Sequence, residues 1–397
     1  MELWEQGMRL KEELSEIRRK IHMKPEKGFE EFETTQLIKQ ALESYGVTIL
    51  DLDMPTGVVG ILCGEKPGKG KTIAFRADMD ALPIVERTGL PYISQEEGKM
   101  HACGHDGHTA MLLGLAKLLS ERRKAFSGAV KFLFQPAEEI AQGAKAMIAA
   151  GALENPKVEE IIALHAWPDY PTGVIGFWEG HYYAAADAFQ VKLIGDSGHG
   201  AYPHKSKDSL LAAAHGVVAL QSITSRQLNA IDNTVLSVCM FHSGTAANVM
   251  PENSEFGGTI RTHNPEIREK MPEKIETIIQ GVANAFQCDY EFKHHKGIPG
   301  VFNHPQMVRD FIDGVEKLLG KEAVKELPGP VMGSEDFGEY SALVEKSAIF
   351  RIGITDKGKP VAPLHSQRFD FNDEAIPYGV VAMAQYVLRE DSQESGQ

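Results

Sequence analysis

The feature that most constrains the fold is an alternation of short apolar runs with amphipathic segments at both ends of the chain. The runs at 71–78, 129–135 and 160–166 suit buried strands, and segments with helical periodicity at 108–122 and 144–151 separate them. Strands that alternate with helices favour an α/β fold with a central, mostly parallel sheet. The same pattern predicts helices at 1–22, 33–45 and 374–389 and a strand at 347–353.

The pattern changes near residue 186 and returns after about residue 300. Between these points the expected order is strand, helix, strand, strand, helix, strand, which is typical of a ferredoxin-like α+β sandwich. A chain of 397 residues is also long enough for two domains. We therefore predict a discontinuous α/β domain of residues 1–186 and 297–397, with an α+β domain of residues 187–296 inserted into it. The inserted strands are expected at 187–195, 234–242, 254–262 and 288–295, and its helices at 208–228 and 265–286.

Charge and composition exclude several classes of partner. The chain has 41 basic and 55 acidic residues and a net charge of −14, which argues against nucleic acid or an anionic membrane as the main partner. It has no run of 18 apolar residues, and its charged N-terminal segment lacks the apolar region of a signal peptide. Four widely spaced cysteines are better read as reduced thiols than as a disulfide framework. We expect a cytoplasmic protein.

The segment MHACGHDGH at 100–108 concentrates residues that can carry chemistry. Cys103 and His105 offer a thiolate and an imidazole, which both suit zinc and related transition metals. Residues at i and i+2 cannot share one face of a helix, so the loop must be irregular, which Gly104 and Gly107 permit. A thiol nucleophile with a histidine base, or a glycine-rich surface turn, would also fit this segment alone.

Further candidate ligands follow predicted strands. Glu138 and Glu139 come just after the strand at 129–135, and His165 closes the strand at 160–166. One of the two carboxylates could bind metal while the other acts as a general base on water. With His365 in a later loop, the chain offers five ligands for divalent metal. Such a set suits a pair of ions about 3.5–4 Å apart, which a cysteine thiolate can bridge.

Seven motifs in order resemble one family. The chain is similar to amidohydrolases of the metallopeptidase family that contains carboxypeptidase G, aminoacylase and succinyl-diaminopimelate desuccinylase. Within that family it most resembles the branch of hippurate hydrolase and the auxin–amino acid conjugate hydrolases, over about residues 10 to 390. The motifs are RADMDALP (76–83), MHACGHDGH (100–108), QPAEE (135–139), GHGAYPH (198–204), NVMPENSEFGGTIRT (248–262), GSEDF (333–337) and LHS (364–366).

The resemblance implies a catalytic α/β domain that holds two divalent metal ions, with zinc favoured and manganese, cobalt or nickel as alternatives. Cys103 would bridge the ions. His105 and His165 would complete one metal site, and Glu139 and His365 the other. Glu138 would be the general base that activates water and then protonates the leaving amine.

The segment that follows the strand at 71–78 departs from the wider family. Asp80 matches an aspartate that orients a metal ligand. Most of the family has a metal-binding histidine where this chain has Asp78, and this branch would supply His105 instead. The motif therefore leaves the roles of Asp78 and Asp80 open.

The resemblance also implies that the inserted domain serves dimerisation. His199 matches a histidine that reaches into the partner subunit's site and polarises the scissile carbonyl. Asn248 and Arg261 match residues that hold the free carboxylate of the substrate, a task suited to the planar fork of arginine. A homodimer is expected, and a tetramer is the alternative.

These observations predict metal-dependent hydrolysis of the amide bond of an N-acyl amino acid to a carboxylic acid and a free amino acid. Two enzyme alternatives remain. One is a dipeptidase or carboxypeptidase that uses the same two-metal site. The other is a thiol amidase with Cys103 as nucleophile and His105 or His108 as base. A binding protein that has kept an inactive site is the alternative outside the enzymes. The loops that would form the acyl pocket carry no readable specificity code.

Overall fold

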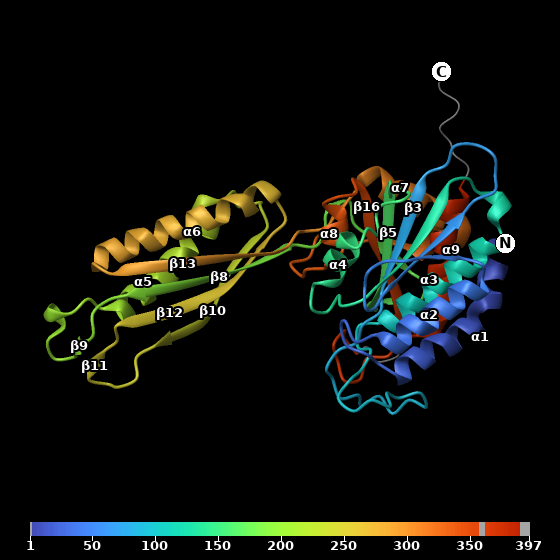
Figure 1. Ribbon diagram of the computed structural model, residues 1–397. Helices are drawn as coiled ribbons and strands as arrows, with labels where there is room; N and C mark the ends of the chain where they lie inside the picture. Colours follow the sequence, from blue (N-terminus) through green and yellow to red (C-terminus); the bar gives the residue numbers. More distant parts are fainter. Residues whose placement is uncertain (1, 357–361, 390–397) are drawn as a thin grey trace, which may run out of the picture. The chain divides into compact units, whose positions relative to one another are not determined.

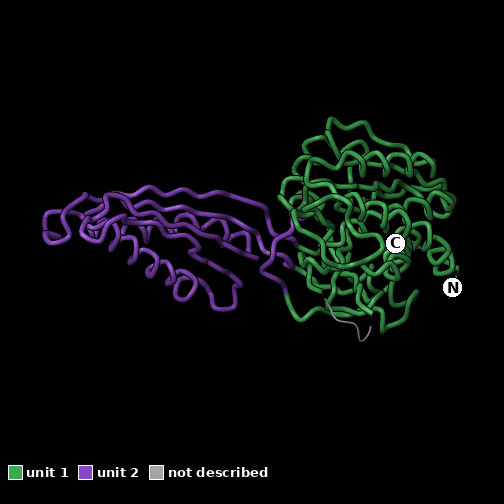
Figure 2. Tube along the Cα trace, turned by 90° about the horizontal axis from the view of Figure 1, so that it is seen from below, with its two compact units in different colours: residues 1–180, 302–329, 339–397 green, residues 181–301, 330–338 purple. Residues whose placement is uncertain are grey.

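The computed structural model describes residues 2–356 and 362–389. These residues form two compact units (Figure 2). Unit 2 consists of residues 181–301 and 330–338, and unit 1 of the remainder. Unit 2 is slightly longer at both ends than the predicted segment 187–296, and it takes up the short stretch around residue 334 as well.

Unit 1 is built on one large sheet, so the predicted mixed α/β fold with a mostly parallel sheet is confirmed (Figure 1). The strand order is β1-β2-β4-β3-β5-β16-β6-β15. The central pairs β4–β3, β3–β5 and β5–β16 are parallel, as is β6–β15, whereas β1–β2, β2–β4 and β16–β6 are antiparallel. The strands are β1 (Thr48–Leu50), β2 (Val58–Cys63), β3 (Thr72–Asp78), β4 (Ala129–Gln135), β5 (Glu160–Pro171), β6 (Ile175–Phe177), β15 (Val324–Glu326) and β16 (Lys346–Thr355).

The central strands are apolar because both faces of the sheet are covered. Every residue of β3 and β4 is buried, as expected for strands enclosed between layers of helices. Helix α3 is also buried along almost its whole length and packs against α1 and α9, which makes it a core helix. The helices of this unit are α1 (Glu2–Met23), α2 (Phe32–Ser44), α3 (His105–Ser120), α4 (Gly143–Ala149), α7 (Pro305–Leu319) and α9 (Ile376–Leu388), and α8 (Gly338–Ser341) begins at the boundary with unit 2.

The start of α3 corrects the sequence prediction of a helix at 108–122. The helix begins at His105, because Gly104 adopts a left-handed conformation with φ of 87° that turns the chain into the first helical residue. His105, which was expected in an irregular loop, therefore lies with His108 in the first turn of a buried helix.

Unit 2 contains a four-stranded antiparallel sheet in the order β10-β12-β8-β13. Its main elements follow the chain in the order β8, α5, β10, β12, α6, β13, and both helices contact the sheet. The predicted helix at 208–228 is shorter, because α5 ends at Ser222 and a π-helical turn at 223–227 follows. The elements are β8 (Ala185–Ile194), α5 (Ser209–Ser222), β10 (Thr234–Ser243), β12 (Asn253–Thr262), α6 (Pro265–Phe286) and β13 (Asp289–Ile298), with a small separate pair of β9 (Gly198–His199) and β11 (Val249–Met250).

Among residues 2–356 and 362–389, no helix has the length and apolar character needed to span a bilayer.

Candidate metal centre

The candidate residues of unit 1 gather where parallel strands end, which is where open α/β sheets bind ligands. Asp80 follows β3 by two residues, and Glu138 and Glu139 follow β4. His165 lies in β5, beside the first turn of α3. Strand order places β4, β3 and β5 next to one another, so these side chains converge.

Gly104 allows Cys103 and His105 to face the same site. A Cβ atom at this position would lie 2.8 Å from the Cβ of Ala166, so a larger residue would collide with β5. The resulting turn brings Cys103 Sγ to 3.6 Å from His165 Nε2, and both side chains are buried. The glycine is therefore needed for its left-handed φ and for the close approach of the loop to β5.

Cys103 belongs to two groups of side chains that could each hold a metal ion. In one group the ligand atoms of Cys103, His105 and His165 all lie within 4.8 Å of one another. In the other, the same holds for Cys103, Glu139 and His365. A cysteine shared by two such groups is the arrangement required for a thiolate that bridges two ions.

The ring nitrogens distinguish ligands from structural histidines. His105 Nδ1 lies 3.1 Å from Asp80 Oδ1, and His165 Nδ1 donates to the backbone oxygen of Ala166 at 2.8 Å. Each ring therefore presents its Nε2 to the site. A metal-binding histidine commonly uses its second nitrogen in this way, because that bond fixes the tautomer and the ring orientation.

His108 differs because both of its nitrogens are occupied. Nδ1 lies 2.5 Å from Asp78 Oδ1, and Nε2 accepts a hydrogen bond of 2.7 Å from the backbone N–H of Ala166. It has no lone pair left for a metal or for a proton from Cys103. His108 therefore suits neither a ligand nor the base of a thiol amidase.

Two buried atoms of the site fit a bound metal. His105 Nε2 and Glu139 Oε1 have no hydrogen-bond partner among the described residues, although buried polar atoms almost always have one. These atoms lie 3.8 Å apart. Divalent cations bound to these two groups, one at His105 and one at Glu139, would satisfy both atoms. The donor set of thiolate, imidazole and carboxylate fits zinc and related divalent ions.

The pKa values of the candidate ligands are also consistent with a bound cation. Burial raises the pKa of the Cys103 thiol and raises that of Glu139 to about 7. Although burial opposes it, the nearby Asp78 carboxylate raises the pKa of His105. Burial lowers the pKa of His165 and keeps it neutral. The protons held by Cys103, Glu139 and His105 are those that a divalent ion would displace.

Glu138 and His365 lie on the open side of the site. Glu138 Oε2 lies 4.0 Å from His105 Nε2, and its side chain is 12% exposed. His365 Nε2 lies 3.5 Å from Glu139 Oε1, and its side chain is 53% exposed. The backbone N–H of His365 donates to the oxygen of Ala102, which ties its loop to the segment that carries Cys103.

Asp80 contacts two of the candidate ligands. Besides its bond to His105, its second oxygen accepts a hydrogen bond of 3.1 Å from the backbone N–H of Glu139. One carboxylate thus orients a ligand of each group.

The candidate residues of unit 2 occupy two separate places. His199 lies in β9 and Asn248 directly precedes its partner β11, so these two are neighbours. Arg261 lies near the far end of β12, where its Nη1 donates to Ser334 Oγ at 2.7 Å. The nine residues of β12 from Asn253 to Arg261 span about 26 Å. Asn248 and Arg261 of one chain therefore cannot hold the same carboxylate.

Sequence reasoning missed Arg76 and the fully buried Arg18. Arg76 Nη1 lies 2.6 Å from Asp78 Oδ2, and the two residues share one face of β3. Arg18 of α1 donates from Nε to Asp106 Oδ2 at 2.7 Å. Strand alternation could have placed Arg76 beside Asp78, but no local pattern links Arg18 to Asp106.

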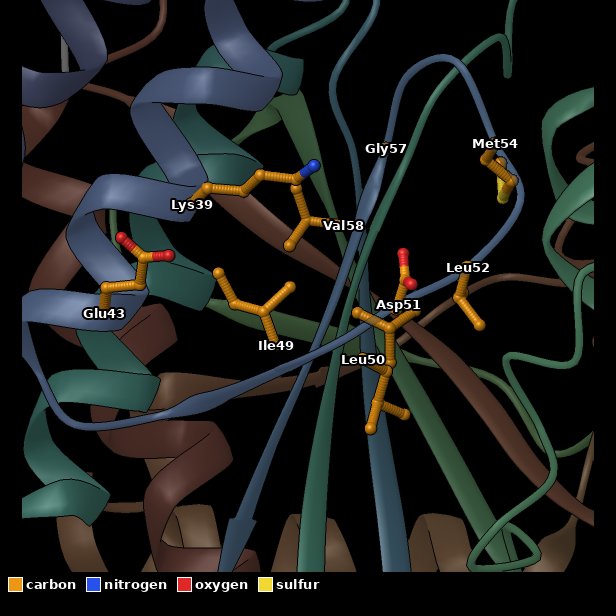
Figure 3. Close-up of a pocket in the computed structure, with 10 residues that line it drawn as sticks. Lys39, Glu43, Ile49, Leu50, Asp51, Leu52, Met54, Gly57 and Val58 are labelled. Atoms are coloured by element: carbon orange, nitrogen blue, oxygen red, sulfur yellow. The ribbon is translucent and has the colours of Figure 1, made fainter.

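An open pocket lies away from these residues, beside the edge strand β1 (Figure 3). It has a volume of about 220 Å³ and combines apolar walls with Lys39, Glu43 and Asp51. None of the candidate metal ligands lines it.

Known proteins show similarity along almost the whole chain. The model of Peptidase family M20/M25/M40 matches residues 74–389. An N-acetylcysteine deacetylase of Bacillus subtilis (strain 168) is 38% identical over 364 residues, covering 91% of this chain and 93% of that protein. The IAA-amino acid hydrolase ILR1-like 4 of Arabidopsis thaliana is 38% identical over 378 residues, covering 94% and 84%.

A solved structure supports the same relationship. The YXEP protein of Bacillus subtilis, described as a dinuclear metal binding peptidase of the M20 family, is 33% identical in sequence. It superimposes with a TM-score of 0.85 over 96% of this chain and 98% of that one. The family resemblance is thereby confirmed, and the chain belongs to Peptidase family M20/M25/M40.

Proposed function

We propose that this chain hydrolyses the amide bond of N-acyl amino acids at a centre of two divalent metal ions. The observation that carries the proposal is the membership of Cys103 in two ligand groups, beside the carboxylate of Glu138. The names of the deacetylase and the IAA-amino acid hydrolase support N-acyl amino acids as the substrate class.

In this proposal Cys103 would serve as a ligand of both ions. His105 and His165 complete one site, and Glu139 and His365 the other. When bound, the ions polarise the amide carbonyl and lower the pKa of the attacking water. Zinc suits the ligands best, and manganese, cobalt and nickel remain alternatives.

Glu138 performs the proton transfers. Its carboxylate takes a proton from the attacking water and then delivers it to the nitrogen of the leaving amino acid. Its position supports this role, because it lies next to the ligands yet keeps partial exposure toward arriving substrate. Asp80 holds His105 and the backbone of Glu139 in place during these steps.

We further propose that residues 187–296 form an inserted dimerisation domain and that the enzyme is a homodimer. His199 would stabilise the developing oxyanion in the partner's site. Asn248 and Arg261 would bind the substrate carboxylate, each from a different subunit. The length of β12 between them supports this division of labour. The four free cysteines support a cytoplasmic location.

Exchange of subunits between two inactive variants tests the role of His199. His199→Ala and Glu138→Gln chains are each expected to be nearly inactive. In a mixed dimer, one site would combine an intact Glu138 with an intact His199 from the other chain. Random mixing makes about half of the dimers mixed, and each mixed dimer has one working site of its two. About a quarter of the unmodified activity is therefore expected to return. Heterodimers isolated with two affinity tags that stay inactive would show that His199 does not act across subunits.

Metal removal tests the proposed reaction itself. N-acetyl and N-benzoyl amino acids are assayed before and after chelation, and again after single additions of zinc, manganese, cobalt or nickel. Activity is expected to fall to background and to return at two ions per chain, because both ligand groups are needed to polarise the carbonyl and to generate the nucleophile.

The same assay separates the alternatives. A thiol amidase would keep its activity after thorough metal removal and lose it on alkylation of Cys103. The raised pKa of that buried thiol argues against this outcome, since a protonated thiol is a poor nucleophile. Dipeptides belong in the panel because the related YXEP protein is described as a peptidase. Hydrolysis of dipeptides alone would replace the proposed substrate class.

A further inference from the structure

A buried chain of hydrogen bonds joins β3, α3 and β5 behind the candidate ligands. Arg76 Nη1 contacts Asp78 Oδ2 at 2.6 Å, and Arg76 Nε donates to Gln135 Oε1 at 2.9 Å. The other oxygen of Asp78 accepts from His108 Nδ1 at 2.5 Å. His108 Nε2 in turn accepts from the backbone N–H of Ala166 at 2.7 Å. All of these side chains are buried.

This series of hydrogen bonds ends at His165, a candidate metal ligand. Ala166 gives its N–H to His108, and its carbonyl oxygen accepts the Nδ1–H of His165. The backbone around Ala166 is therefore held on one side by α3 and holds the imidazole of His165 on the other. With Nδ1 protonated, the lone pair of His165 is on Nε2, which faces Cys103.

The hydrogen bonds of His108 have a required direction. Its Nε2 must accept, because the backbone N–H of Ala166 can only donate. In the neutral ring Nδ1 must then carry the proton and donate it to Asp78. The ionised carboxylate of Asp78, placed between Arg76 and His108, selects this tautomer. Asp78 thus has a role that the sequence left open.

We propose that His108, held by Asp78 and Arg76, is a positioning residue that fixes the tautomer and orientation of His165 in the metal centre. This inference rests on the proposed function, because it assumes that His165 is a ligand. His108 acts through Ala166 and touches neither the ions nor the substrate. Without it, the part of β5 around Ala166 could shift relative to Cys103, which precedes α3, and to His105, which begins it.

Two amide substitutions separate the bonds that His108 makes. The amide of His108→Asn reaches the position of Nδ1, so this variant can keep the bond to Asp78 but loses the one to Ala166. The amide of His108→Gln reaches the position of Nε2, so its oxygen can still accept from the Ala166 N–H. The two variants are similar in volume and polarity, which makes each the control for the other.

The experiment measures the binding of Cd²⁺ to the full-length apoprotein by competition with a chromophoric chelator. The unmodified protein is expected to bind two ions. His108→Asn is expected to bind one of them about 10–100-fold more weakly, the range typical for loss of a partner behind a ligand. His108→Gln should retain most of the affinity. The ¹¹³Cd resonances should report a changed environment in the Asn variant.

Each outcome decides a separate point. Equal Cd²⁺ affinity in His108→Asn and the unmodified protein would overturn the inference. So would an equal loss in the Asn and Gln variants, which would indicate packing alone. If the His108→Asn variant fails to fold, Asp78→Asn provides the second test. It should weaken the binding of the same ion, because the carboxylate that selects the tautomer of His108 is lost. An unmodified protein that binds fewer than two Cd²⁺ ions would instead remove the proposed metal centre.

Discussion

Replacement of Glu138 by glutamine is expected to lower kcat by about 10²–10⁴-fold, the usual contribution of a general base. Glutamine has nearly the same shape, but its amide cannot take a proton from water or deliver one to the leaving amine. Neither of the two groups that share Cys103 includes Glu138. The variant should therefore keep two bound metal ions per chain while losing its activity.

The neighbouring carboxylate provides a matched control. Glu139→Gln removes a proposed ligand, so metal content should fall together with activity. Steady-state kinetics and elemental analysis of both variants separate proton transfer from metal binding. A Glu138→Gln enzyme that keeps more than a tenth of its kcat, or that loses its metal as Glu139→Gln does, would contradict the assigned role.

Replacement of Arg18 by methionine is expected to destabilise unit 1 by about 3–5 kcal/mol, the usual cost of breaking a buried ion pair. Arg18 is completely buried and donates to Asp106 at 2.7 Å, and its Nη1 lies 3.4 Å from Asp373. Although burial opposes it, the neighbouring Asp106 raises the pKa of this guanidinium. Methionine fills similar space but leaves the buried charge of Asp106 without its main partner.

Arg19 supplies the control for this measurement. It also pairs with Asp373, at 2.7 Å, but its side chain is 43% exposed. Arg19→Met should therefore cost no more than about 1 kcal/mol. All three tryptophans, Trp4, Trp167 and Trp178, lie in unit 1, so fluorescence during urea unfolding reports on that unit. If Arg18→Met and Arg19→Met lower the free energy of unfolding equally, the burial of Arg18 contributes nothing to stability.

The sequence predicted the elements that have a strong local pattern. The strand at 129–135 was placed at its observed bounds, and the ends of α1, α2, α6 and α9 lie within two residues of their predicted positions. It did not predict the longer elements β2 and α7. It also missed β1, β6 and β15, since strands of three residues carry too little alternation to be recognised. The early start of α3 depends on the conformation of Gly104, which composition alone does not reveal.

The sequence likewise predicted some features of the candidate site and not others. Residue types and motif order identified Cys103, Glu138, Glu139 and their companions as candidates, because their chemistry is carried by single side chains. The bonds that orient them could not be predicted. The contact of Arg18 with Asp106 joins residues 88 positions apart, and the bond between His108 and Ala166 depends on how α3 lies against β5.

The strand order of unit 1 has a consequence for synthesis on the ribosome. β16 occupies the place between β5 and β6, yet its first residue, Lys346, follows the last residue of β5, Pro171, only after all of residues 181–301. At the usual rates of translation, β5 waits on the order of 10–35 s for this neighbour. During that interval the hydrogen-bonding edge beside His165 is open to other strands, and a co-translational chaperone would be most useful there.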